Sequence, residues 1–162
     1  MTVVGGKITT YRVLAEAVMR RIAPKTKRWT AKVPLPGGDV PRLAGENGQG
    51  AFKRWLSNLM QANENYDPKI VRRLARTLGT AAEPLLAAGL GDNLGGIFEA
   101  ELQHFRDAEW ARTADDVLWR RTKLGLHLDA AAQASVTAWF GEAAPAVAPI
   151  TPAHRFAVPG VD

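Results

Sequence analysis

Apolar residues at helical spacing recur through most of this chain, and this periodicity constrains its fold more than any other feature. The first series falls at i, i+3, i+4, i+7 and i+8 and consists of Phe52, Trp55, Leu56, Leu59 and Met60. The second follows Asp67-Pro68, precedes Gly79 and consists of Val71, Leu74, Ala75 and Leu78. Asp is a good helix N-cap, Pro suits the first helical position, and Gly commonly ends helices. Both segments are therefore predicted to be amphipathic helices.

Later segments carry their own helix signals. Thr80 with Glu83 has capping-box spacing before a short helix through Leu86, and Thr113 with Asp116 repeats that spacing. Between these two capping boxes we expect a helix with Ile97, Leu102 and Phe105 on its apolar side. Gly125 is expected to end the helix that holds Trp119. Asp129 is expected to cap the last helix, whose apolar residues are Val136, Trp139 and Phe140. Helix follows helix, so the fold class is predicted to be mainly α, with a compact helical domain.

The first residues differ from the rest. Thr2–Val4 is predicted to be a short strand, Gly5-Gly6 a tight turn, and the segment from Ile8 or Thr9 to Ile22 a helix stopped by Pro24. Glycines let a ligand approach the backbone, and a helix N-terminus beside Lys7 suits an anion or an electron-rich ring oxygen. An ordinary strand-to-helix turn explains the same residues, and the spacing fits neither a Walker loop nor a dinucleotide fingerprint.

Three blocks together resemble one family. They are Gly5–Arg12 followed by Ala15-Glu16-Ala17, then Leu35–Asp39 after Trp29-Thr30, and then Glu109–Leu126. In this order and at these separations they resemble the C-terminal part of FAD-dependent, quinone-linked glycerol-3-phosphate dehydrogenases. The resemblance implies a remnant of the FAD-binding domain (strand, turn and helix) at 1–23 and a helical C-terminal domain at 42–142. The Pro and Gly residues of 24–41 predict a connector between them, and the Ala- and Pro-rich composition of 143–162, without periodicity, predicts a flexible tail.

The same resemblance implies a site at the first turn. Gly5, Gly6, Lys7, Ile8, Thr9 and Thr10 would bind FAD, and Lys7 would also reach the substrate phosphate. The implied reaction oxidises glycerol 3-phosphate to dihydroxyacetone phosphate by hydride transfer to FAD, with the electrons passing to quinone. No catalytic residue and no metal ligand is assigned in this chain. The implied location is cytoplasmic, with peripheral attachment to the inner membrane through other parts of the enzyme.

Composition limits other classes of function. There are no cysteines, so disulfides and thiol chemistry are excluded, and no apolar run approaches the roughly 18 residues that a membrane-spanning helix needs. The net charge of +5 combines +8 over residues 1–61 with −3 over the remainder, which suits an acidic ligand or surface and equally a solvated basic face. Trp119–Lys123 matches no nucleic-acid motif, so nucleic acid is not an expected partner.

The polar side chains of the helical part have structural explanations. The histidines, His104, His127 and His154, lack metal-ligand spacing. The acidic residues of the later helices are expected to be helix N-terminal charges and ion-pair partners of Arg112, Arg120 and Arg121; they are Glu99, Glu101, Asp107, Glu109, Asp115 and Asp116.

One departure from the family affects the functional expectation. The glycine-rich dinucleotide motif of the flavin domain, and the family's substrate-binding arginines and catalytic histidine, have no counterpart in these 162 residues. The sequence therefore looks like a truncated or split coding region, and the isolated chain is expected to be inactive and to bind FAD weakly. Two alternatives remain: a helical interaction module that docks on a separate flavin subunit, and a stand-alone anion-binding protein that uses Lys7.

Overall fold

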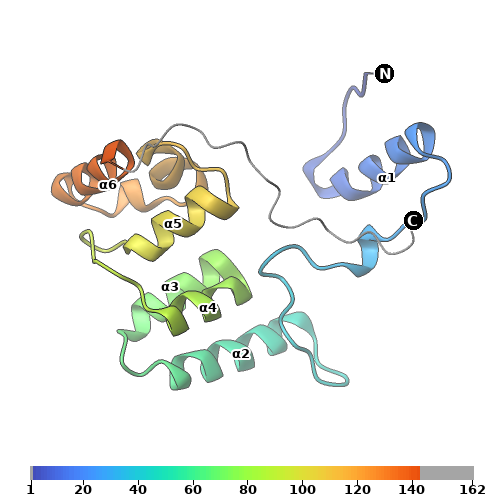
Figure 1. The fold of residues 1–162 in the computed structure, drawn as a ribbon. Helices are drawn as coiled ribbons and strands as arrows, with labels where there is room; N and C mark the ends of the chain where they lie inside the picture. Colours follow the sequence, from blue (N-terminus) through green and yellow to red (C-terminus); the bar gives the residue numbers. More distant parts are fainter. Residues whose placement is uncertain (1, 143–162) are drawn as a thin grey trace.

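The computed structural model describes residues 2–142, which form a succession of helices (Figure 1). The α-helices are α1 (Tyr11–Ile22), α2 (Gly48–Ala62), α3 (Pro68–Leu78), α4 (Ala82–Ala88), α5 (Glu99–Ala108) and α6 (Ala130–Glu142). Shorter helical turns are η1 (Ile8–Thr10), η2 (Thr30–Lys32), η3 (Gly79–Ala81), η4 (Asp116–Arg121) and η5 (Leu124–Leu126). The predicted mainly α fold is confirmed. The expected tail at 143–162 lies outside the described residues.

The predicted strand at Thr2–Val4 is wrong. These residues have no regular secondary structure, and the described part of the chain contains only an isolated antiparallel bridge between Asn93 and Phe98. A strand is stable only when a neighbouring strand takes up its backbone N–H and C=O groups, and none of residues 2–142 lies beside Thr2–Val4 in that way. Residues Thr2–Val4 therefore have a sequence that favours an extended backbone, but they lack the neighbouring strand that a sheet requires.

The hydrophobic core lies among α2–α6. Its largest fully buried apolar side chains are Leu74 and Val71 from α3, Leu102 and Phe105 from α5, Ile97, Val117, and Val136 from α6. The predicted apolar series on α2 and α3 face this core, with Trp55, Leu59 and Leu78 also buried. By contrast, none of residues 2–50 is buried, and Figure 1 shows α1 standing apart from the other helices.

Local capping signals explain several helix boundaries. The Asp67 side chain accepts a hydrogen bond from the backbone N–H of Lys69 at 2.8 Å, and Asp129 accepts one from Ala132 at 2.8 Å. Thr113 and Asp116 form the predicted reciprocal capping box. These helix starts are confirmed, as is the helix end at Gly79.

The predicted capping box of Thr80 and Glu83 is wrong, although α4 forms. The Thr80 hydroxyl donates to the carboxylate of Asp39, and the Glu83 carboxylate accepts from the indole N–H of Trp55. Both side chains therefore bind partners distant in sequence. The backbone N–H of Thr80 also donates to the carbonyl of Gly37 at 3.0 Å, which holds the connector against the α3–α4 junction.

The helix around Trp119 ends earlier than predicted. It closes as a π-helix at Arg121, where the N–H of Thr122 donates to the carbonyl of Val117 at 2.9 Å. Gly125 instead lies inside η5, close against the Trp119 ring, where a Cβ atom would lie 2.4 Å from the ring. Trp119 is 37% exposed, so it covers this turn and is not part of the core.

Candidate functional site

The turn before α1 has the backbone geometry that its sequence predicts. Gly5 and Gly6 have φ angles of +89° and +111°, a region that side-chain-bearing residues rarely adopt. The backbone N–H and the hydroxyl of Thr10 both donate to the carbonyl of Lys7, at 2.9 and 3.0 Å, and start η1. Gly5–Thr10 therefore form one continuous turn that leads directly into α1.

This turn leaves hydrogen-bonding groups free. No oxygen in residues 2–142 accepts a hydrogen bond from the backbone N–H of Ile8 or Thr9. Every residue from Thr2 to Thr10 is exposed, including Ile8 at 88%. Free N–H groups at the start of a helix carry partial positive charge, so the turn can donate to an anion or to a carbonyl oxygen of a ligand.

A polar cluster fastens the segment after α1 to that helix. Glu16 accepts hydrogen bonds from the hydroxyl of Thr30 at 2.5 Å and from Arg12 at 3.1 Å, and Arg28 lies 3.8 Å away. The sequence blocks around Glu16 and around Trp29-Thr30 are therefore in contact. The sequence alone carried no signal for this contact, because the two segments are separated by a loop of unpredictable path.

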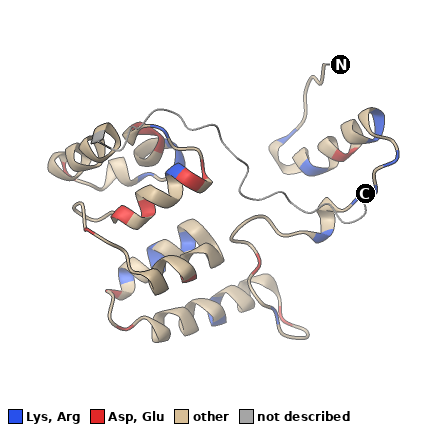
Figure 2. Ribbon diagram, in the orientation of Figure 1, with Lys and Arg blue, Asp and Glu red and all other residues tan. Residues whose placement is uncertain are grey.

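Two shallow apolar grooves flank this cluster. One, of about 350 Å³, lies between Ala15, Met19 and Trp29, and the other, of about 240 Å³, lies between Tyr11, Val33 and Leu35. Arg20, Lys27 and Arg28 are among the residues that line the first groove, together with Glu16. Figure 2 shows Lys and Arg along α1 and the segment that follows it. The arrangement combines apolar surface with positive charge.

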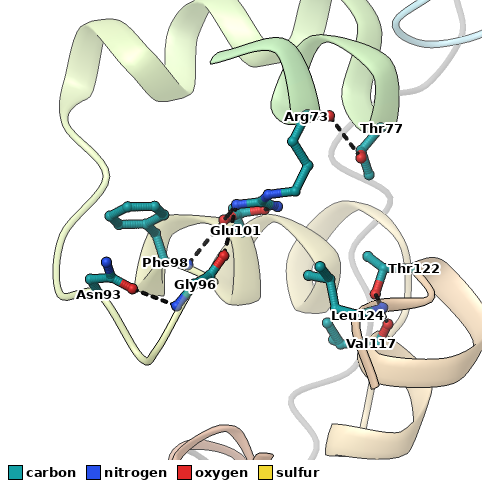
Figure 3. A network of polar contacts seen from close by, with 9 residues as sticks. All are labelled: Arg73, Thr77, Asn93, Gly96, Phe98, Glu101, Val117, Thr122 and Leu124. Atoms are coloured by element: carbon teal, nitrogen blue, oxygen red, sulfur yellow. Dashed lines mark hydrogen bonds and ion pairs between the residues drawn. The ribbon is translucent and has the colours of Figure 1, made fainter. Parts of the chain in front are cut away.

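A second polar cluster lies inside the helical core. The Glu101 carboxylate is wholly buried, and its two oxygens pair with the Arg73 guanidinium at 2.5 and 2.7 Å. One of these oxygens also accepts from the backbone N–H of Phe98 at 3.0 Å, and Arg73 donates to the carbonyl of Gly96 at 3.2 Å (Figure 3). Each polar group is satisfied, so this cluster joins α3 to α5 and presents no free acid or base.

The predicted ion-pair partners are only partly right. Asp116 pairs with Arg120 at 3.0 Å, as expected, and Glu109 lies 4.0 Å from Arg121. Glu101 stands in the first turn of α5, as a helix N-terminal charge should, but its partner is Arg73. The prediction missed Arg73 because it lies on another helix, 28 residues earlier in the chain.

Hydrogen bonds shift the acidity of a few groups. Hydrogen bonds from the Arg54 side chain, and then from the backbone N–H of Leu43, lower the pKa of Glu46. The hydrogen bond to Glu46 raises the pKa of Arg54. The backbone N–H of Arg112 is the main cause of a lowered pKa of Asp116. Glu46 and Arg54 join α2 to the segment before it, Asp116 belongs to the capping box before η4, and none of the three lies at the turn before α1.

The remaining chemical candidates are dispersed. His104 lies 3.6 Å from Glu109, His127 is exposed, and His154 lies outside the described residues. Residues 2–142 contain no group of three or more side chains that could hold a metal ion. In the same range no helix is both long and apolar enough to cross a membrane.

Comparison with known proteins places these features in a family. Residues 28–147 match the family described as the C-terminal domain of alpha-glycerophosphate oxidase. The aerobic glycerol-3-phosphate dehydrogenase of Escherichia coli (strain K12) is 37% identical over 152 residues, which cover 88% of this chain and 29% of that protein. A glycerol-3-phosphate dehydrogenase of Pseudomonas tolaasii is 40% identical over 149 residues, covering 84% of this chain and 27% of its own length.

A third relative has a different substrate in its name. The D-erythritol 1-phosphate dehydrogenase of Brucella abortus (strain 2308) is 37% identical over 154 residues, covering 88% of this chain and 29% of that protein. The chain thus spans less than a third of the length of each of these relatives.

Proposed function

Because the chain belongs to the family of C-terminal domains of alpha-glycerophosphate oxidase, we propose that it is the C-terminal part of an FAD-dependent glycerol-3-phosphate dehydrogenase. In this proposal residues 1–23 complete a flavin-binding domain and residues 24–41 connect it to the helical domain at 42–142. The flavin domain itself is the partner of this chain.

The observation that carries the proposal is the apolar surface of the N-terminal segment. Nine of the thirteen exposed large hydrophobic residues in the described part of the chain lie between positions 3 and 35. Val4 and Leu35 are 91% and 66% exposed. Nine exposed large apolar side chains within one short segment make this segment suited to burial against another domain.

The residues of the first turn fit an FAD ring. The positive φ angles of Gly5 and Gly6 let a flat ring approach the backbone, and the free N–H groups of Ile8 and Thr9 can donate to its carbonyl oxygens. The Thr10 hydroxyl already donates to the Lys7 carbonyl within the turn. Its contribution in the proposal is to shape the turn.

The chemistry of the proposed reaction assigns this chain a supporting role. FAD, when bound, would accept a hydride from the alcohol carbon of the substrate and would pass the electrons to quinone. The partial positive charge at the start of η1 and α1 would stabilise negative charge that develops on the ring. Lys7, an exposed cation beside the turn, would bind the substrate phosphate.

The substrate is a polyol phosphate. Two of the relatives above are named for glycerol 3-phosphate and one for D-erythritol 1-phosphate, which share a terminal phosphate beside secondary hydroxyl groups. Glycerol 3-phosphate is our first candidate and D-erythritol 1-phosphate the second. The alternative to this proposal is a non-catalytic helical module that docks on a separately encoded flavin subunit through the same apolar surface.

A chimera tests the proposal. Residues 1–162 would replace the matching part of the Escherichia coli relative, and dye reduction with each polyol phosphate would be measured along with the flavin spectrum. We expect a yellow chimera that is active with glycerol 3-phosphate, whereas the chain alone is colourless and inactive. An isolated chain that binds stoichiometric FAD and reduces the dye would refute the proposal.

Variants of the chimera separate its parts. Lys7→Ala should lower kcat/KM roughly tenfold or more, the factor typical of losing a charged hydrogen bond, while the flavin spectrum is unchanged. Lys25→Ala removes an exposed lysine outside the turn and should have no effect. If activity returns only when the chain is mixed with a separately expressed flavin subunit, the docking-module alternative is correct.

A further inference from the structure

A hollow of about 530 Å³ lies on the helical domain, away from the first turn and α1. One wall comes from the second half of α3 and contains Arg73, Arg76 and Thr77. The other comes from the end of η4 and the residues after it, and its polar members are Arg121, Thr122, Lys123 and His127. Four cationic side chains and a histidine therefore line the hollow, and no carboxylate does.

Two of these cations are already balanced. Arg73 forms the buried pair with Glu101, and Arg121 lies 4.0 Å from Glu109. Within residues 2–142, however, no carboxylate lies within ion-pair distance of Arg76 or Lys123. These two cations face the same hollow from opposite walls, which leaves it with an excess of positive charge.

Helix ends account for only part of this charge. Arg76 lies in the last turn of α3 and Arg121 in the last turn of η4, where cations offset the partial negative charge of the helix C-terminus. That charge is about half an elementary charge for each helix. Two whole cations without a carboxylate partner exceed it, so the hollow keeps a net positive potential that attracts an anion.

The hydroxyl groups of the walls are engaged in the fold. Thr77 donates to the carbonyl of Arg73 at 2.9 Å, and Thr122 donates to the carbonyl of Val117 at 2.6 Å (Figure 3). Thr122 also accepts from the N–H of Leu124 at 3.1 Å, which fixes the loop that carries Lys123. A ligand would therefore be held by guanidinium and ammonium groups on a wall that is already ordered.

We propose that this hollow binds a phosphate group. A guanidinium, which Arg76 supplies, offers paired N–H donors that match phosphate oxygens. Lys123 adds a point charge: its ammonium donates one N–H to the carbonyl of Trp119, which holds the side chain in place, and keeps its other N–H groups for a ligand. The phosphate belongs either to a small soluble ligand or to a lipid headgroup. The site shares no residue with the first turn, so it is independent of the proposed flavin contact.

The test uses the full chain and two phosphate probes. Binding of inorganic pyrophosphate is measured by NMR titration, and binding of phosphatidylglycerol vesicles by cosedimentation against phosphatidylcholine vesicles. Pyrophosphate should shift the backbone amide signals of Thr77, Thr122 and Lys123, and its affinity should fall as salt is raised. Binding to the vesicles alone would identify a lipid headgroup as the source of the phosphate.

A pair of double variants makes the result decisive. Arg76→Gln with Lys123→Gln should weaken binding roughly 20-fold, since one exposed Coulomb contact in water is worth about fivefold. The control, Lys25→Gln with Lys53→Gln, removes the same charge outside the hollow and should change binding less than about twofold.

Three results would overturn the proposal: no binding of either probe, equal losses in the two double variants, or amide shifts centred elsewhere. Circular dichroism checks that each variant is folded. If the double variant Arg76→Gln, Lys123→Gln loses helical signal, the single variants Lys123→Gln and Lys53→Gln are compared instead. Lys123→Gln should then weaken binding of the probe more than Lys53→Gln does.

Discussion

Replacing Arg73 with methionine should destabilise the helical domain more than any other single removal of a charge. The variant leaves the Glu101 carboxylate wholly buried with only one remaining donor, the N–H of Phe98. Removing one partner of a buried ion pair costs about 3 to 5 kcal/mol of unfolding free energy. Because the Arg73 side chain is 24% exposed, water can approach the vacated position, and we expect the lower end, about 3 kcal/mol.

The reverse change should cost less. Glu101→Gln keeps the shape of the side chain and an acceptor for Phe98, and the remaining Arg73 still bonds to the carbonyl of Gly96 and reaches solvent. We expect a loss of about 1 to 2 kcal/mol, close to that of a hydrogen bond to a charged group.

Urea unfolding followed by helical circular dichroism measures both losses. Arg72→Met, on the same turn of α3 but exposed, should change the unfolding free energy by less than about 0.5 kcal/mol. For a chain of this size a loss of about 3 kcal/mol corresponds to a Tm lower by about 6 to 12 °C. An Arg73→Met protein as stable as Arg72→Met, or a Glu101→Gln protein less stable than Arg73→Met, would refute the argument.

Two further variants test the connector and a helix cap. Gly37 and Gly45 both have φ +78°, but a Cβ on Gly37 would lie 2.2 Å from the carbonyl oxygen of Leu78, whereas one on Gly45 meets nothing within 4 Å. Gly37→Ala should therefore lower stability by about 1 to 3 kcal/mol more than Gly45→Ala in urea unfolding. Asp116→Asn should cost about 1 kcal/mol at pH 7 through the weakened capping box.

The cost of Asp116→Asn should depend on pH in a defined direction. Hydrogen bonds lower the pKa of Asp116 in the folded protein, so its contribution is complete above the unfolded pKa and is lost as the pH falls through the folded value. The difference between the wild type and the variant should shrink below about pH 4. A difference that grows on acidification, or equal losses for Gly37→Ala and Gly45→Ala, would contradict these interpretations.

Helix positions were predictable where the signal is local. Asp67 caps the helix that begins at the next residue by accepting from the N–H of Lys69, two residues ahead. Thr113 and Asp116 each accept a hydrogen bond from the other's backbone N–H within a single turn. In both cases neighbours in sequence decide the outcome. Thr80 and Glu83 have the same spacing, yet they bind Asp39 and Trp55. The side chains of a capping box can bind the backbone at the helix start or any other polar group that folding brings near. Their spacing in the sequence gives no information about those distant groups.

In the candidate site, too, local features were predictable and contacts between distant segments were not. Gly5, Gly6 and Lys7 could be singled out because turn geometry depends on adjacent residues, and the positive φ angles agree with that prediction. Their proposed role in binding FAD remains a prediction. The contact of Glu16 with Thr30 and the hollow between Arg76 and Lys123 join separate segments, so no local pattern indicates them.

The sequence by itself determined the helices, most of their starts and the family, because periodicity, caps and motif blocks are properties of consecutive residues. Only the tertiary structure decided that Arg73 neutralises Glu101, that Thr2–Val4 has no strand partner, and that basic side chains from two helix ends meet in one hollow. Burial, strand pairing and local electric fields depend on which distant segments approach one another, and the packing of the helices sets that approach.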